Sequence, residues 1–289
     1  MYPLFYKKLA IGIIFIPSIV FWGSGILKDC YTLSAVGWLT YNIYMIVIKR
    51  QKIFVNILIM IINGYIIISL KPYIIVALLP GILLWASFEW TQKIKNVVVR
   101  RLIGPGLILA GMGVGVLALS VFGNNLGSYT NIKAMSEKAQ TTQQDLIRGE
   151  QYGSNYYDVG KFDASLTGIL TKAPISILSA LFRPFIWEAK NPVMILSGLE
   201  NLIILCSFLL IIVRVGLFKT IKIVGSEPLL LFSLLFAIIF AFSVGLASAN
   251  FGALVRYRIP CMIFFIPSLF ILFERMKEKR AKDREEMTV

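Results

Sequence analysis

Residues 53–70 read IFVNILIMIINGYIIISL, an apolar block that lies between Lys52 and Lys71. A helix rises about 1.5 Å per residue, so a block of this length nearly crosses the roughly 30 Å hydrocarbon core of a bilayer. Comparable blocks recur along the chain. We predict eight transmembrane helices, at about 9–27, 31–48, 53–70, 73–88, 102–122, 193–213, 229–249 and 259–273.

The composition supports a membrane protein. Of the 289 residues, 57% are hydrophobic and 15% are charged, and the mean hydropathy is +0.78. Soluble domains carry about 25% charged residues. The composition therefore excludes a soluble domain, a disordered chain and a disulfide-stapled secreted domain, and predicts an all-α polytopic membrane helical bundle.

The basic residues define an orientation. The chain has 29 Lys plus Arg and 15 Asp plus Glu. With the N-terminus inside, 18 basic residues fall on inner segments and four on short outer turns. Inner loops of membrane proteins are enriched in Lys and Arg. We therefore expect a multi-pass protein of the bacterial inner membrane with both termini cytoplasmic, and we expect no nucleic-acid partner.

The predicted spans divide the chain into four parts. Helices one to five occupy residues 1–122, and helices six to eight occupy 193–273. Between them, residues 123–192 form an outer-face loop with a polar helix over about 131–148. The charged segment 274–289 is a cytoplasmic tail.

The outer-face loop contains an amphipathic segment at Pro174–Trp187. Fourteen residues are too few to cross the bilayer, and its aromatic side chains suit the headgroup level. We predict an interfacial helix there.

The chain contains no histidine, so it lacks the commonest general base and metal ligand. No phosphate-binding glycine-rich loop or nucleophile elbow is present. We expect neither a metal nor a cofactor. Cys30 and Cys261 both fall near outer span ends, although an unpaired thiol is the simpler expectation.

The first candidate patch is Lys28-Asp29, at the outer end of the first span. Pro17, Gly23 and Gly25 permit a break in this span, and broken spans are tolerated where they line a cavity. The alternative is a kinked helix that ends in an interfacial Lys–Asp pair.

The second candidate patch contains Arg183, Trp187 and Glu188. Arginine can clamp a phosphate, and Trp187 can stack on a sugar ring. The alternative is an aromatic belt with an anchoring arginine.

The third candidate patch contains Asn250, Arg256 and Arg258. Two arginines on the outer side run against the inner bias for basic residues and suggest an anionic partner such as a diphosphate. The alternative is an ion pair with Asp29 or Glu188.

Glu200 lies about two turns into the sixth predicted span. An ionisable residue at membrane depth is a functional candidate. A buried pair with Arg256 or Arg258 is the alternative.

Three short motifs carry a resemblance to a known group of proteins. They are FWGSGILKD at 21–29, FRPFIWE at 182–188 and VRYRIP at 255–260. Together they resemble bacterial multi-pass proteins of surface polysaccharide synthesis, including O-antigen-type polymerases and lipid-linked-sugar glycosyltransferases of the membrane C-type fold.

The resemblance implies sugars linked to undecaprenyl diphosphate, transferred on the outer face of the membrane. By that analogy Arg183, Arg256 and Arg258 would bind the diphosphate, and Asp29, Glu188 or Glu200 would be the base. Lys28, Trp187 and Asn250 would complete the substrate site.

Such enzymes usually have ten or more spans, so this chain could be the C-terminal portion of a longer protein. The paired acidic motif of C-type transferases is missing. The histidine of O-antigen ligases is also missing, which disfavours that subfamily.

Two further functions stay open at this point. One is a flippase or transporter of the same lipid-linked oligosaccharide. The other is a non-catalytic subunit of a polysaccharide assembly complex, with partner subunits supplying the chemistry. Membrane lipids are expected partners in every case.

Overall fold

The computed structural model describes residues 5–122, 132–147, 156–157, 159–160, 162–163 and 165–287. Every regular element in these ranges is helical, and Tyr156 and Asn250 form an isolated antiparallel bridge. The N-terminal half comprises α1 (Tyr6–Ile14), α2 (Pro17–Gly23), α3 (Lys28–Ile43), η2 (Tyr44–Lys49), α4 (Ile53–Leu70), α5 (Tyr73–Gln92) and α6 (Val97–Phe122). The rest comprises α7 (Ile132–Ile147), α9 (Leu166–Thr171), α10 (Ala173–Phe182), η4 (Ile186–Glu188), α11 (Pro192–Val215), α12 (Leu217–Ser226), α13 (Pro228–Ala247), α14 (Phe251–Tyr257) and α15 (Ile259–Met287).

Among the described residues, six helices are long and apolar enough to cross a membrane: α3 with η2, α4, α6, α11, α13 and α15. The pair α1 and α2 would make a seventh span. The remaining predicted span, 73–88, is the apolar part of α5 and is shorter than these. The predicted all-α polytopic bundle is confirmed, and the chain is a multi-pass membrane protein.

The first predicted span, 9–27, is broken. α1 and α2 meet at an angle of 59°, and Pro17 is the first residue of α2. Proline has no N–H and its ring clashes with the carbonyl four residues earlier, so a helix cannot run through it unchanged. At this break Ile16, the residue before the proline, is extended, the conformation that a following proline favours.

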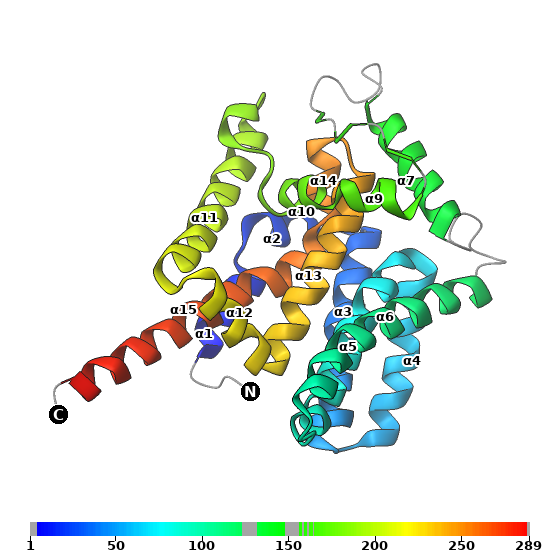
Figure 1. Ribbon diagram of the computed structural model, residues 1–289. Helices are drawn as coiled ribbons and strands as arrows, with labels where there is room; N and C mark the ends of the chain where they lie inside the picture. Colours follow the sequence, from blue (N-terminus) through cyan, green and yellow to red (C-terminus); the bar gives the residue numbers. More distant parts are fainter. Residues whose placement is uncertain are drawn as a thin grey trace.

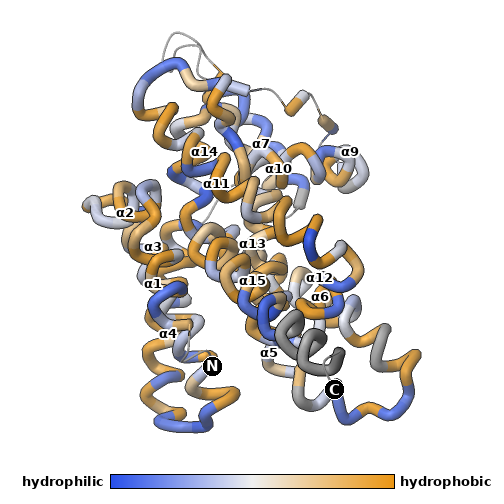
Figure 2. Tube along the Cα trace, turned by 90° about the vertical axis from the view of Figure 1, so that its left-hand side faces the viewer, coloured by the Kyte–Doolittle hydropathy of each residue, from blue (hydrophilic) through white to orange (hydrophobic). Residues whose placement is uncertain are grey.

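The core forms around α13, which packs against α5, α10 and α15 at the centre of Figure 1. The completely buried rings of Phe232, Phe236 and Phe240 lie along it. α6 covers α5 closely because Gly111 and Gly115 face the α5 backbone. Figure 2 shows hydrophilic residues mainly at the turns and ends of the bundle, as expected for apolar spans.

The segment 123–192 differs from the prediction in where its helices lie, and α9 has no predicted counterpart. α7 confirms the polar helix, but the amphipathic helix is α10, which ends at Phe182. Residues 183–185 are non-helical and lead into η4. α10 lays Ser176, Ala180 and Phe182 into the core and leaves Ile175 and Leu178 exposed. Residues 123–131 and 148–155, which are also part of the predicted loop, lie outside the described residues.

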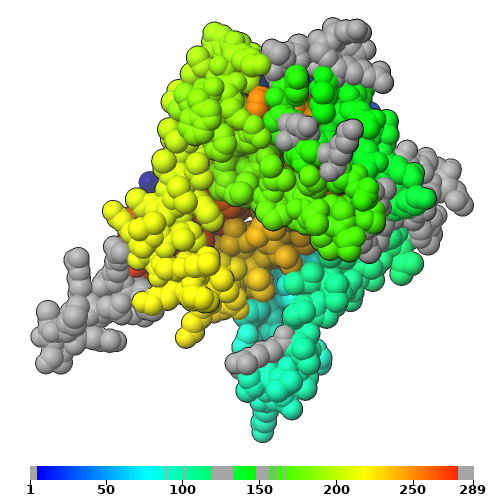
Figure 3. Space-filling view, turned by 45° about the horizontal axis from the view of Figure 1, so that its top comes forward, coloured from blue at the N-terminus to red at the C-terminus, as the bar shows by residue number. Residues whose placement is uncertain are grey.

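One end of the bundle gathers the elements that position the candidate site. We call it the loop face. It consists of α10, η4 and α14, together with the adjoining ends of α2, α3, α4, α5, α11, α13 and α15. In Figure 3, an orange patch in the colour of the residues near position 250 shows between the green and yellow-green elements of this face. Lys8 of α1 and Glu274 of α15 form an ion pair away from this face, and Figure 1 shows α1 and α15 side by side there.

Candidate functional site

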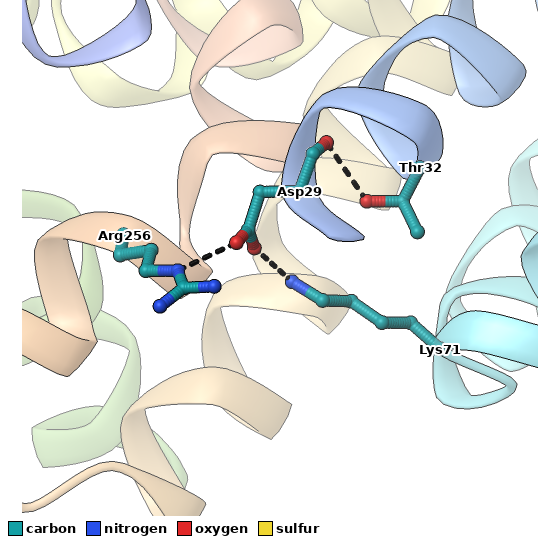
Figure 4. Close-up of polar contacts among 4 residues, drawn as sticks. All are labelled: Asp29, Thr32, Lys71 and Arg256. Carbon is teal, nitrogen blue, oxygen red and sulfur yellow. Dashed lines mark hydrogen bonds and ion pairs between the residues drawn. The ribbon is translucent and has the colours of Figure 1, made fainter. Parts of the chain in front are cut away.

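The centre of the site is Asp29, in the first turn of α3. Its side chain is 1% exposed, and its two carboxylate oxygens accept hydrogen bonds from different cations (Figure 4). Lys71, between α4 and α5, donates to Oδ1. Arg256 Nε donates to Oδ2 over 2.5 Å. Asp29 thus joins three segments that are far apart in the sequence.

Of the three residues in this contact, Arg256 is the accessible one. Its side chain is 31% exposed and lies over the rings of Trp22 and Tyr257, at 5.5 and 5.9 Å from their centroids. Only Nε bonds to Asp29. The two terminal nitrogens make no hydrogen bond to any residue that the structure describes. Arg256 therefore keeps donors for a ligand.

Lys28 adds an exposed cation at the start of α3. We call Lys28, Asp29, Lys71 and Arg256 the Asp29 cluster. Lys71 and Arg256 contact the carboxylate, and Lys28 lies close enough to act on Lys71. With three cations and one carboxylate, the cluster is net positive. Burial, reinforced by the neighbouring Arg256 and Lys28, lowers the pKa of Lys71 against the opposing effect of Asp29. The arrangement favours an additional anion.

Arg258 lies in a different environment, although it is only two residues from Arg256. Its side chain is completely buried. It donates to the carbonyl oxygens of Ala180 and Arg183 over 3.0 and 2.9 Å, and to Asn201 Oδ1 over 2.5 Å. Burial lowers the pKa of Arg258. This predicted diphosphate ligand instead holds the end of α10 against α11, because its donors point to the backbone and not to solvent.

Asn201 completes that arrangement. Its amide nitrogen donates to the carbonyl oxygen of Pro184 over 2.9 Å. Arg258 and Asn201 together bind the backbone of the short segment that carries Arg183 and Glu188. Asn201 was missed in the sequence because an asparagine next to Glu200 gives no sign of which backbone it will meet.

Arg183 and Glu188 pair with each other. Arg183 Nε donates to Glu188 Oε2 over 3.1 Å, and a second bond joins the other oxygen. The guanidinium lies 4.8 and 5.3 Å from the ring centroids of Tyr157 and Phe251. Glu188 also accepts from the Phe185 N–H over 2.9 Å. Both predicted functional groups are therefore engaged with protein.

Trp187 is free to contact a ligand, whereas the side chain of Asn250 is engaged with protein. Trp187 is 76% exposed and stacks on Phe185, with 4.7 Å between the ring centroids. This position suits a sugar ring or the membrane interface. Asn250 caps α14 by accepting hydrogen bonds from the Gly252 and Ala253 N–H groups. The side-chain oxygen of Asn250 is thereby occupied.

Glu200 lies on α11 and meets the break in the first span. Its carboxylate accepts from the N–H and the hydroxyl of Ser18, over 3.0 and 2.6 Å. It forms no ion pair with Arg256 or Arg258 among the contacts of the described residues. Glu200 holds the start of α2, where the backbone donors are free because a helix begins.

The structure separates the predicted site residues into three groups, and Trp187 lies exposed apart from them. Lys28, Asp29 and Arg256 come together, joined by Lys71. Arg183 and Glu188 form a separate pair, and Glu200, Asn250 and Arg258 support the backbone around the site. All three predicted bases are engaged, and none presents a free carboxylate to solvent in this arrangement.

Metal-binding groups are not found in the described part of the chain: no three His, Cys, Asp or Glu side chains lie close enough to hold an ion. Cys30, Cys206 and Cys261 are free thiols.

Comparison with known proteins adds no family. No family model, no curated protein and no solved structure matches this chain. The fold and the site define a polytopic helical membrane protein with a buried carboxylate–cation cluster on its loop face.

Proposed function

We propose that the protein transfers or polymerises sugars from an undecaprenyl-diphosphate-linked donor on the outer face of the bacterial inner membrane, in the synthesis of a cell-surface polysaccharide. The observation that carries the proposal is Arg256. Its terminal nitrogens are unused by the described residues, and its side chain is partly exposed within a net positive cluster. Guanidinium and ammonium groups are the protein ligands that suit a diphosphate.

The reaction needs charge stabilisation on the leaving group. An acceptor hydroxyl oxygen bonds to the anomeric carbon, the bond from that carbon to the diphosphate oxygen breaks, and its electron pair remains on the diphosphate. Arg256 and Lys28 stabilise this developing charge. A carboxylate receives the hydroxyl proton, and Asp29 is the carboxylate nearest these cations.

The charge distribution supports an outer position for the site. Lys49, Arg50 and Lys52 occupy the turn opposite the loop face, and Arg214, Lys219 and Lys222 lie in or beside α12 near the same end. By the inner bias of basic residues, that end is cytoplasmic. The loop face would then meet lipid-linked sugars outside.

The test uses the full-length protein in liposomes with an undecaprenyl-diphosphate-linked oligosaccharide as donor and acceptor. Arg256→Ala is expected to lower product formation at least tenfold at subsaturating donor. The matched control, Arg214→Ala, removes an exposed arginine at the other end of the bundle and is expected to leave turnover unchanged. Equal turnover by Arg256→Ala and wild type would overturn the proposal.

A second function is favoured by a specific observation. Because Asp29, Glu188 and Glu200 are all engaged, the same cluster could bind a lipid-linked diphosphate without transferring its sugar, as a flippase or a non-catalytic subunit would. In that case the same liposomes retain Arg256-dependent donor binding, yield no product and, for a flippase, move donor across the bilayer.

A further inference from the structure

The Asp29 carboxylate lies between Lys71 and Arg256, where an external anion such as phosphate could otherwise bind. Both of its oxygens face cations, one from Lys71 and one from Arg256, and the carboxylate is almost fully buried. A phosphate oxygen has the same charge and accepts the same hydrogen bonds. The side chain therefore satisfies internally the donors that an external phosphate would otherwise use.

The two contacts of Asp29 differ in accessibility. The Lys71 side chain is 9% exposed, and its ammonium lies 5.1 Å from the Tyr257 ring centroid. The Arg256 side chain is 31% exposed and gives Asp29 only Nε. An exposed single contact is the weaker one, because water and ions compete with it. The Arg256 contact is thus the half that an incoming anion can replace.

We propose that Asp29 is a tethered counter-ion that a phosphate or diphosphate displaces from Arg256, leaving Asp29 bound to Lys71. Arg256 then binds the anion through two nitrogens, which a guanidinium does readily. The displacement frees Asp29 Oδ2 next to the bound anion. Before an anion binds, the Asp29 carboxylate balances the positive charge of Arg256.

One consequence depends on the proposed function. If the anion is the diphosphate of a sugar donor, Asp29 Oδ2 becomes available only once the donor is bound, and it receives the proton of the acceptor hydroxyl as the new glycosidic bond forms. The base is then assembled by the donor itself. Without a bound donor, no free base faces water.

The experiment measures inorganic pyrophosphate binding to the full chain in detergent micelles, by titration calorimetry and by the shift in melting temperature. Sodium chloride at matched ionic strength separates binding from screening. Pyrophosphate is expected to stabilise the wild type in a concentration-dependent manner. Asp29→Asn is expected to melt lower without the anion and to bind pyrophosphate at least tenfold more tightly, because the internal competitor is neutral.

Two further variants complete the test. Arg256→Lys keeps a cation for Asp29 but loses the two terminal nitrogens, and is expected to bind pyrophosphate at least tenfold more weakly while remaining folded. Glu278→Gln, at the other end of the bundle, should match the wild type. If Asp29→Asn does not fold, Asp29→Ser takes its place, with the same expected gain in affinity. Absence of a wild-type response, equal affinity in Arg256→Lys, or unchanged affinity in a folded Asp29→Asn would overturn the inference.

These measurements are independent of sugar transfer. If pyrophosphate binds with the expected pattern but the liposomes show no sugar transfer, the counter-ion role of Asp29 stands and the enzymatic function is overturned. If transfer depends on Arg256 but Asp29→Asn has the pyrophosphate affinity of the wild type, the enzymatic function stands and the counter-ion role is overturned.

Discussion

Arg256 and Arg258 lie two residues apart and bind opposite sides of the loop face. Residues of a helix are about 100° apart around its axis, so positions i and i+2 do not share a face. Arg256 reaches Asp29 on α3, whereas Arg258 is buried against the carbonyl oxygens at the end of α10. α14 and the residue that follows it therefore position an open cation, Arg256, and a sealed one, Arg258.

Because Arg256 is partly exposed and Arg258 is buried, replacing each of them by lysine should change stability by different amounts. Arg258→Lys replaces a fork with three partners by a single ammonium and leaves buried acceptors unsatisfied, which should cost about 2 kcal/mol or more of stability. Arg256→Lys is partly exposed and should cost less than about 1 kcal/mol. Thermal unfolding in detergent measures both. Equal losses in the two variants would contradict the distinction.

The Ser18–Glu200 contact should stabilise the break in the first span. Glu200→Ala leaves the Ser18 N–H and hydroxyl without their acceptor and should destabilise by about 1–3 kcal/mol. A double-mutant cycle with Ser18→Ala isolates the side-chain bond and should give a coupling of about 0.5 kcal/mol or more. Strict additivity of the two single changes would show that the bond contributes nothing.

The contact between α5 and α6 should tolerate a methyl group at one glycine and not at another. A Cβ on Gly111 would lie 2.6 Å from backbone atoms of Pro80, whereas one on Gly113 meets nothing within 4 Å. Gly111→Ala should therefore cost about 1–3 kcal/mol through overpacking. Gly113→Ala should be neutral, or stabilising by up to about 1 kcal/mol, because alanine favours helix. Denaturation of both variants in the same detergent provides the comparison.

Tyr157 should make stability depend on alkaline pH. Burial raises the pKa of Tyr157 above its ordinary value of about 10. Above pH 10 the unfolded chain loses this proton while the folded chain retains it, so stability falls by up to about 1.4 kcal/mol per pH unit. In Tyr157→Phe, the free energy of unfolding should fall less steeply between pH 10 and 11 than it does in the wild type.

The neighbouring Tyr156 provides the control for that measurement. It is 46% exposed, so Tyr156→Phe should show the same fall in the free energy of unfolding with pH as the wild type. The same slope in Tyr157→Phe and the wild type would assign the pH dependence to other groups.

Hydropathy predicted most of the spans because burial in lipid requires long apolar runs. Residues 53–70 are found as α4 with the same bounds. Among the described helices, six of the eight predicted spans are long enough to cross, 9–27 is a bent pair and 73–88 is shorter. Some helices also continue beyond their apolar part. α6 begins at Val97 and includes Arg100 and Arg101, whereas its predicted start is 102. Hydropathy does not detect a polar helical turn.

The site was predictable only in part. Pairing of Arg256 with Asp29 was one of the alternatives, and the structure contains it. Lys71 was recognised only as one of four basic residues on short outer turns. Its isolated position after an apolar run was the available signal, but no local pattern indicates a contact with Asp29, 42 positions away. The prediction that Arg258 binds a diphosphate was wrong because two of its partners are backbone carbonyl oxygens, and the sequence does not indicate which carbonyl groups an arginine will meet.

The contact between Asp29 and Arg256 spans 227 positions of the chain. During translation, Asp29 and Lys71 emerge early and can meet as soon as α3, α4 and α5 are inserted. Arg256 is synthesised much later, after α11 and α13. In the nascent protein the Asp29–Lys71 contact can therefore form first, and the contact of Asp29 with Arg256 can form only after α14 has been synthesised.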